Sequence, residues 1–285
     1  MRLVLLTLMA LVAFAANSIL CRLALRHGEI DPVSFTAIRI AAGAIVLVAL
    51  VRLRGLAIGG NWPSSLALLA YAIGFSLAYV ALPAGIGALM LFGAVQVTMI
   101  GTGLVNGERP QAHEWIGEGL SIIGLIALLL PGVTAPPLGG SLLMLGAGIA
   151  WAIYSLRGRR GGDPTGATAG NFLRATPLAL LPIALQPQLH ASATGVVFAV
   201  LSGAVASGLG YAVWYTVLPK LTAMRAGLVQ IAVPVLVALV GIGLLGEPPS
   251  LRLLLCALLI LGGLALATLY RPASRRPVRA APSTR

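Results

Sequence analysis

The sequence predicts an all-α membrane protein with ten transmembrane helices, arranged as two inverted five-helix repeats around a central cavity. Three observations carry this prediction. Of the 285 residues, 59% are hydrophobic and only 9% are charged, whereas a soluble domain carries about 25% charged residues. The apolar residues form long runs, and about 20 such residues span a bilayer core. The two halves of the chain also repeat one pattern of residues.

Proline, glycine and charged residues divide the chain into ten apolar segments. We expect helices over 3–25, 32–53, 62–82, 84–106, 112–131, 138–157, 165–186, 194–218, 221–245 and 250–270. The first segment is longer than the apolar region of a signal peptide, and no A-x-A-like cleavage site stands out, so we expect it to be retained. Cys21 and Cys256 fall inside apolar segments and are expected to be small buried residues, not a disulfide or metal pair.

The basic residues predict the orientation in the membrane. With the N-terminus inside, the outer side keeps little more than Arg26 and Arg252. The inner side collects Arg2, Arg52, Arg54, Arg109, Arg157, Arg159, Arg160, Lys220, Arg225 and the five arginines of the tail. Because such residues are enriched in cytoplasmic loops, we expect both termini in the cytoplasm of a bacterium, with the chain in its inner membrane. The net charge of +12 does not indicate nucleic acid, since no soluble face collects it. Residues 272–285 are expected to form a disordered tail that contacts anionic lipid headgroups.

The repeat relates residues 1–132 to residues 137–271. "GFSLAYVALP" at 74–83 and "GYAVWYTVLP" at 210–219 share glycine, tyrosine, leucine and proline, 136 residues apart. The other matched pairs, at offsets of 135 to 139, are Arg22/Arg157, Arg39/Arg174, Glu108/Glu247 and Gly124/Gly263. The alternative is that helices rich in glycine, alanine and leucine align by composition alone. Two like halves with five helices each must lie in opposite orientations, a plan of secondary transporters that bind substrate between the repeats.

Several motifs resemble the drug/metabolite transporter superfamily, in particular its ten-helix EamA-type branch. These are "NSILCRLAL" at the end of the first segment, the two Gly-Glu pairs that contain Glu108 and Glu247, and the aromatic-rich stretches before Pro83 and Pro219. The resemblance covers residues 1–270, and within the branch the chain looks most like YddG-type amino acid exporters. It implies a cavity lined mainly by the first, third, fourth, sixth, eighth and ninth helices, and export of amino acids or similar metabolites.

Polar side chains at mid-membrane depth are costly in lipid and usually face a cavity. Asn17, Gln96 and Gln230 lie near the centres of the first, fourth and ninth segments. Each amide could bind the ammonium and carboxylate groups of a zwitterion, or it could join two helices by a hydrogen bond. Pro234 removes the hydrogen bond to the carbonyl of Gln230, so we expect the ninth helix to kink there, for binding or for packing.

Aromatic residues complete the candidate substrate site. They lie in the middle of the sixth segment or toward the ends of the third and eighth, and are Trp151, Tyr154, Tyr79, Tyr211, Trp214 and Tyr215. Tyr79 and Tyr215 correspond in the repeat and are predicted as paired gate residues on opposite sides of the membrane. The alternative for either is a ring at the membrane interface.

The remaining charged residues are predicted to be structural. Arg39 and Arg174 lie about 10–12 Å inside their helices, and in the family these helices lie toward the outside, which favours packing or snorkelling. Glu108 and Glu247 are expected to stabilise the starts of the fifth and tenth helices. Glu118 is the one acidic residue well inside a segment. Without a buried relay, an uncoupled facilitator is at least as well supported as a proton-coupled carrier.

The leading hypothesis is a secondary carrier that exports amino acids, including aromatic or hydrophobic ones, or related small metabolites. The same fold could carry drugs, nucleosides or lipid-linked sugars. A membrane-embedded enzyme is disfavoured, because motifs such as H-E-x-x-H and G-x-S-x-G are absent from the sequence. We expect no cofactor and no metal. The expected partners are the small-molecule substrate and the lipid bilayer, and the chain is expected to be a monomer.

Overall fold

The computed structural model describes residues 2–105, 111–130, 135–158, 163–185, 189–220, 229–230 and 232–269. Within these residues the structure is helical, and strand pairing is limited to one isolated bridge between Ile30 and Ala191. The helices are α1 (Arg2–Arg26), α2 (Pro32–Leu53), α3 (Trp62–Ala81), α4 (Ala84–Val105), α5 (Ala112–Leu129), α6 (Leu138–Gly158), α7 (Pro164–Leu185), α8 (Ala193–Leu201), η1 (Ser202–Leu209), α9 (Gly210–Val217), η2 (Leu218–Lys220), α11 (Ala232–Leu245) and α12 (Leu251–Leu269).

The observed helices follow the predicted segments closely. Helices α8, η1, α9 and η2 are consecutive parts of one span, Ala193–Lys220, so the described residues contain the ten expected segments. Residues 221–228 of the ninth segment and the tail 272–285 lie outside the described residues. Six helices of the described part are long and apolar enough to cross a membrane: α1, α2, α3, α4, α6 and Ala193–Lys220. The prediction of an all-helical membrane protein is confirmed.

Side-chain caps explain why several helix starts could be predicted. The Oδ1 atom of Asp31 accepts hydrogen bonds from the backbone N–H groups of Val33 and Ser34, and Pro32 occupies the first helical position of α2. These contacts satisfy N–H groups that have no partner within the helix. The other capping residues are Asn61 before α3, Asp163 before α7 and Ser192 before α8.

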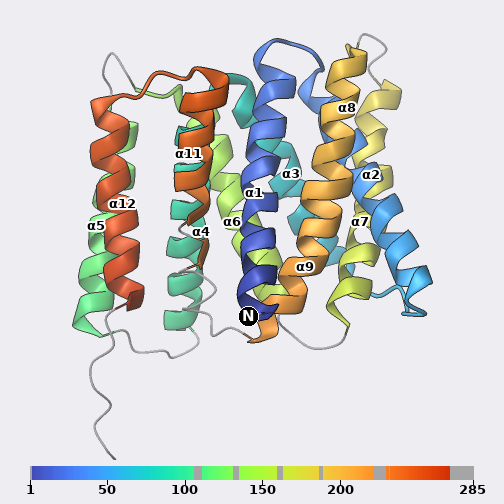
Figure 1. The fold of residues 1–285 in the computed structure, drawn as a ribbon, viewed down its shortest axis with the longest axis horizontal. Coiled ribbons are helices and arrows are strands. Elements are labelled where there is room, and N and C mark those ends of the chain that lie inside the picture. Colours follow the sequence, from blue (N-terminus) through green and yellow to red (C-terminus); the bar gives the residue numbers. More distant parts are fainter. Residues whose placement is uncertain are drawn as a thin grey trace, which may run out of the picture.

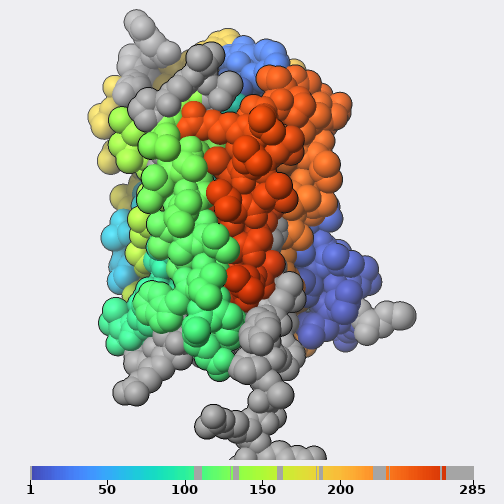
Figure 2. Space-filling model, turned by 90° about the vertical axis from the view of Figure 1, so that its left-hand side faces the viewer, coloured from blue at the N-terminus to red at the C-terminus, as the bar shows by residue number. Residues whose placement is uncertain are grey.

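The helices stand side by side in an elongated bundle (Figure 1). The pair α5 and α12 forms one end, as Figure 2 shows from that side, and the pair α2 and α7 forms the other. Helices α1, α3, α4, α6, α11 and the span Ala193–Lys220 fill the middle. We call the top of Figure 1, with the connections 27–31 and 246–250, the upper face, and the bottom, with 54–61 and η2, the lower face.

Helices α2 and η1 pack closely through small residues. A Cβ atom at Gly203 would overlap the backbone of Arg39, and one at Gly43 would lie 3.1 Å from the carbonyl oxygen of Gly203. Such small residues let helix backbones approach each other within a membrane. The close approach brings the side chain of Arg39 against η1 and determines the centre of the bundle.

Candidate functional site

A cluster of aromatic and polar side chains fills the centre of the bundle. It draws on α1, α2, α3, α6, η1 and α9, and therefore on both halves of the chain. None of its members is more than 6% exposed. We call it the central cluster; its members are Phe14, Asn17, Arg39, Tyr71, Phe75, Trp151, Ser202, Ser207, Tyr211 and Trp214.

Arg39 is the charged residue of the central cluster and is only 1% exposed. Its Nε atom donates to Ser207 Oγ at 3.2 Å, and its Nη2 atom donates to the hydroxyls of Tyr71 at 3.1 Å and Tyr211 at 3.4 Å. Its Cζ atom lies 5.1 Å from the ring centroid of Tyr71 and 5.0 Å from that of Phe75, which is cation–π distance. Of the two expectations for Arg39, snorkelling at the outside is wrong, because α2 presents this side chain to η1, where it packs in the centre of the bundle.

Asn17 connects the arginine to the first helix. Its Nδ2 atom donates to the Tyr71 hydroxyl at 3.1 Å, and its Oδ1 atom accepts from Ser202 Oγ at 2.7 Å. The Tyr71 hydroxyl therefore accepts from both Asn17 and Arg39. The resulting network joins α1, α2, α3 and η1, and a buried polar network of this kind holds its members in one arrangement.

The π-helix η1 explains how both of its serines take part. In an α-helix, residues five apart point about 140° away from each other. A π-helix has i→i+5 hydrogen bonds, so such residues lie one turn apart on the same face. Ser202 reaches Asn17 on α1 and Ser207 reaches Arg39 on α2. Short π-helical stretches are frequent at functional sites.

Aromatic rings surround the polar network. Trp151 lies 4.9 Å from Tyr211, 5.0 Å from Tyr71 and 5.7 Å from Phe14, measured between ring centroids. Phe14 also meets Trp214 edge-on at 5.5 Å. Offset and edge-to-face arrangements at these distances are the favoured geometries of aromatic pairs. The rings provide an apolar surface with polar groups at its margin.

A small cavity lies within the central cluster. Its volume is about 10 Å³, which is barely enough for one water molecule. Its walls combine residues of α1, α3, α4, α6 and α9: Phe14, Asn17, Ser18, Tyr71, Phe75, Leu91, Phe92, Trp151 and Tyr211. The conformation is therefore closed around its centre, and a metabolite could enter only after the helices move apart.

Three predicted substrate residues, Asn17, Trp151 and Tyr211, line this cavity. Three more lie beside it: Trp214 packs on Phe14, Tyr154 lies 5.8 Å from Trp151, and Tyr215 meets Tyr154 edge-on at 5.8 Å. Tyr79 lies toward the upper face, where its ring contacts Phe75 at 4.7 Å and its hydroxyl donates to the carbonyl of Ala84 at 3.3 Å. A role in binding or gating stays a prediction for each.

The other predicted residues lie apart from the cavity. Gln96 is buried on α4, one helical turn beyond Phe92, and Gln230 is buried just before α11. Neither lines the cavity in this conformation, and their contact with substrate stays a prediction. Pro234 lies near the start of the described part of α11. The expected kink falls where residue 231 lies outside the described residues, and it too stays a prediction.

The upper face is closed by a charged contact between the two halves. The carboxylate of Glu247 accepts from the backbone N–H of Ala84, at 2.8 and 3.0 Å, and from Arg22 Nε at 3.2 Å. Arg22 also donates to the carbonyls of Tyr79 and Val80. The prediction that Glu247 stabilises the start of its own following helix is wrong. The carboxylate stabilises the N-terminus of α4, because the glycine turn at 246 directs it back into the bundle. Glu108 lies outside the described residues.

The lower face is held differently. Arg157, the repeat partner of Arg22, donates to Ser64 Oγ at 3.0 Å and to Asn61 Oδ1 at 3.2 Å. Arg174 donates to the backbone carbonyls of Gly59 and Gly170. Among the described residues, these two arginines have neutral acceptors, whereas the upper face contains an ion pair.

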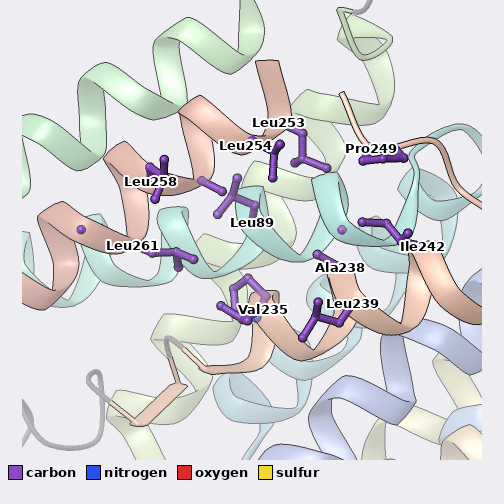
Figure 3. Close-up of a pocket in the computed structure, with 14 residues that line it drawn as sticks. Leu89, Val235, Ala238, Leu239, Ile242, Pro249, Leu253, Leu254, Leu258 and Leu261 are labelled. Carbon is purple, nitrogen blue, oxygen red and sulfur yellow. The ribbon is translucent and has the colours of Figure 1, made fainter. Parts of the chain in front are cut away.

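A second cavity opens between α4, α11 and α12 (Figure 3). Its volume is about 360 Å³, and it includes Leu89 of α4, Leu239 of α11 and Leu258 of α12. The labelled side chains are aliphatic or proline, so they offer no group that could bind an ammonium or carboxylate. The polar chemistry needed for an amino acid is found in the central cluster. Among the described residues, no group of three histidine, cysteine or acidic side chains could hold a metal ion.

Six of the ten residues of the central cluster were not predicted as site residues: Phe14, Arg39, Tyr71, Phe75, Ser202 and Ser207. Tyr71 could have been found, because it lies four residues before Phe75 and eight before Tyr79, and residues at this spacing share a face of a helix. The depth of Arg39 in its helix was an indication that it faces the interior, since about 10–12 Å is far for a side chain to reach the interface. The role of the serines depends on η1, which no local pattern indicated.

Comparisons with known proteins agree with this architecture. The EamA-like transporter family matches residues 138–269. The chain is 54% identical to an uncharacterized protein of Pseudomonas aeruginosa over 93% of this chain and 94% of that protein. It is 31% identical to the threonine/homoserine exporter RhtA of Escherichia coli, over 74% of this chain and 73% of the exporter. It is 30% identical to the uncharacterized inner membrane transporter YedA of Escherichia coli over 49% of this chain and 48% of YedA.

A solved crystal structure shares the fold. It aligns with a TM-score of 0.69 and 23% sequence identity, and the alignment covers 93% of this chain and 98% of the other. The apolar spans and the bacterial relatives together support a multi-pass protein of the inner membrane. The resemblance predicted from the sequence motifs is confirmed: the chain belongs to the EamA-like transporter family.

Proposed function

We propose that this chain is a secondary carrier that exports amino acids or related small metabolites by alternating access. The central cluster is the observation that carries the proposal. It places an amide, a guanidinium, two tyrosine hydroxyls and several aromatic faces at the junction of the two halves. A zwitterion needs such neighbouring donors and acceptors, and an amino acid side chain needs an apolar surface. A relative is named as a threonine/homoserine exporter, which supports this class of cargo.

The packing of the helices supports two inverted repeats, over 1–132 and 137–271. Exchanging the halves relates α1 to α6, α2 to α7, α3 to the span Ala193–Lys220, α4 to α11 and α5 to α12. Under this exchange the α4–α6 contact corresponds to the α11–α1 contact, and the α2–η1 contact to the α7–α3 contact. The pairs α2–α7 and α5–α12 correspond to themselves. Arg39 lies between matching residues, since Tyr71 and Phe75 correspond to Ser207 and Tyr211.

Alternating access follows from exchanging the conformations of the halves. In the present conformation Arg22 and Glu247 close the upper face. In the exchanged conformation, the repeat assigns the same contact to Arg157 and Glu108 at the lower face. Tyr79 and Tyr215 would exchange their positions as gate residues. From the distribution of basic residues we infer that the lower face lies in the cytoplasm, with both termini.

Counterflow in proteoliposomes tests the proposal. Vesicles that contain the purified chain are loaded with one unlabelled amino acid at a time and placed in a radiolabelled amino acid. We expect transient accumulation of label for at least one pair, and none in vesicles without protein. A chain that shows no counterflow with any amino acid, although it exchanges another class of solute, would contradict the proposed cargo and leave the family unchanged.

A further inference from the structure

We propose that Arg39 binds the carboxylate group of the transported substrate and that the carrier therefore selects molecules with a free carboxylate. This inference rests on the proposed function. It assigns a role to a residue whose sequence position indicated only packing.

The first argument is the charge of the site. Arg39 is buried, yet its hydrogen-bond acceptors are the neutral hydroxyls of Ser207, Tyr71 and Tyr211. The ion pair found in the described part of the chain is that of Arg22 with Glu247. Buried charges are normally paired, because removing a charge from water is costly. A buried cation without an anionic partner is suited to receive one from a ligand.

The second argument is that the guanidinium has an unused donor. The guanidinium has five N–H groups in a planar fork. Nε and Nη2 have partners, whereas Nη1 has no hydrogen-bond partner among the described residues although it is fully enclosed. The adjacent Nη1 and Nη2 atoms match the two oxygens of a carboxylate, which accepts two parallel hydrogen bonds from this edge. A lysine at this position would offer one point charge and no such fork.

The third argument is access from the cavity. Tyr71 and Tyr211 line the small cavity, and their hydroxyls occupy Nη2. A carboxylate that enters from the cavity would replace these hydroxyls on Nη2 and also reach Nη1. Asn17 and Trp151 line the same cavity and are placed to meet the rest of the molecule. The tyrosine hydroxyls thus act as stand-in ligands while no substrate is bound.

The test compares an amino acid with its amide. L-threonine and L-threoninamide have nearly the same size and share the ammonium group, and L-phenylalanine and its amide provide a second pair. Purified wild-type protein is assayed by inhibition of counterflow and by ligand-dependent thermal unfolding, which reports binding without transport. We expect each transported acid to bind at least about tenfold more tightly than its amide, since a hydrogen bond to a charged group is strong.

Arg39→Gln should remove this preference, so that acid and amide bind equally weakly. Arg174→Gln is the matched control, because it removes the corresponding charge of the other repeat, and it should keep the wild-type preference. If Arg39→Gln does not fold, Arg39→Lys keeps the charge without the fork and should show a smaller preference than wild type. A preference as large as that of wild type in either Arg39 variant overturns the proposal.

The outcomes separate this inference from the proposed function. Counterflow of amino acids with equal affinity for their amides refutes the role of Arg39 and leaves the carrier intact. Loss of the wild-type preference when the chloride concentration of the buffer is raised would assign Arg39 to an inorganic anion and refute the proposal as well. Absence of amino acid counterflow with every probe refutes the proposed function itself.

Discussion

Arg39 and Arg174 occupy the same position in the two halves of the chain, yet their side chains have opposite surroundings. Arg39 points into the centre of the bundle and binds three hydroxyl groups. Arg174 points to the lower face and binds the carbonyl oxygens of Gly59 at 2.7 Å and Gly170 at 2.9 Å. Arginines at repeat-related positions thus have different roles. Arg39 supplies a cation at the centre, and Arg174 holds the connection between α2 and α3 against α7.

The residue four positions earlier accounts for the difference. Gly170 precedes Arg174, and a Cβ atom there would overlap the carbonyl of Gly59. The connection between α2 and α3 can therefore lie against α7 and offer a carbonyl to Arg174. The residue four positions before Arg39 is Phe35, a large side chain that is fully buried. The comparison teaches that one neighbour on the same helical face can change the role of a duplicated residue.

Arg22 and Arg157 differ in a similar way, because Arg22 binds a carboxylate and Arg157 binds neutral acceptors. Removing the charge of that carboxylate should produce the largest effect. Glu247→Gln removes the charge that Arg22 meets at the upper face. A hydrogen bond to a charged group contributes about 1.5–3 kcal/mol, so opening of this face should increase about tenfold or more. Native Cys21, which is buried beneath this contact, reports the opening through its rate of reaction with a maleimide in a Cys256→Ala background.

The matched control for this measurement is Glu29→Gln, which removes another upper-face carboxylate that binds Ser192. It should leave the labelling rate of Cys21 unchanged. Equal labelling in wild type and Glu247→Gln would show that the ion pair does not hold the upper face closed. The difference between the partners of Arg22 and Arg157 would then not explain why the upper face is closed.

Gly170→Ala sharpens the comparison between the two buried arginines. The added Cβ atom would displace the carbonyl of Gly59 and break its bond to Arg174. We expect the free energy of unfolding to fall by about 1–3 kcal/mol, with transport per folded molecule retained. Gly146→Ala on α6 is the control, because its Cβ atom would meet open space. Chemical denaturation of both proteins measures the difference, and equal stability would contradict the role given to Gly170.

The smallest expected effect is the difference in stability between variants of the two serines of η1. Ser207→Ala removes an acceptor from the Arg39 cation and should cost about 1.5 kcal/mol or more, whereas Ser202→Ala removes a neutral hydrogen bond to Asn17 and should cost about 1 kcal/mol. Thermal unfolding of both variants beside wild type gives the order. The reverse order would mean that Arg39 does not depend on η1 for its position.

The fold was largely predictable because its signals are local. Long apolar runs define the helices, and residues such as Asp31, Asn61 and Pro32 mark where helices begin. Asn17, Trp151 and Tyr211 could be assigned to the centre because polar and large aromatic residues at mid-depth are rare. The direction of Arg39 could not be predicted, since it depends on contacts with a helix more than 160 residues away. The partner of Glu247 was missed for the same reason, because Ala84 lies in the other half of the chain.

The narrowness of the central cavity has an electrical consequence. A volume of about 10 Å³ holds at most one water molecule, and proton conduction needs a continuous file of water that joins both surfaces of the membrane. Among the described residues, the aromatic rings of the central cluster interrupt such a file at the centre of the bundle. Between transport events, the resting protein would preserve the proton gradient of the cell instead of dissipating it.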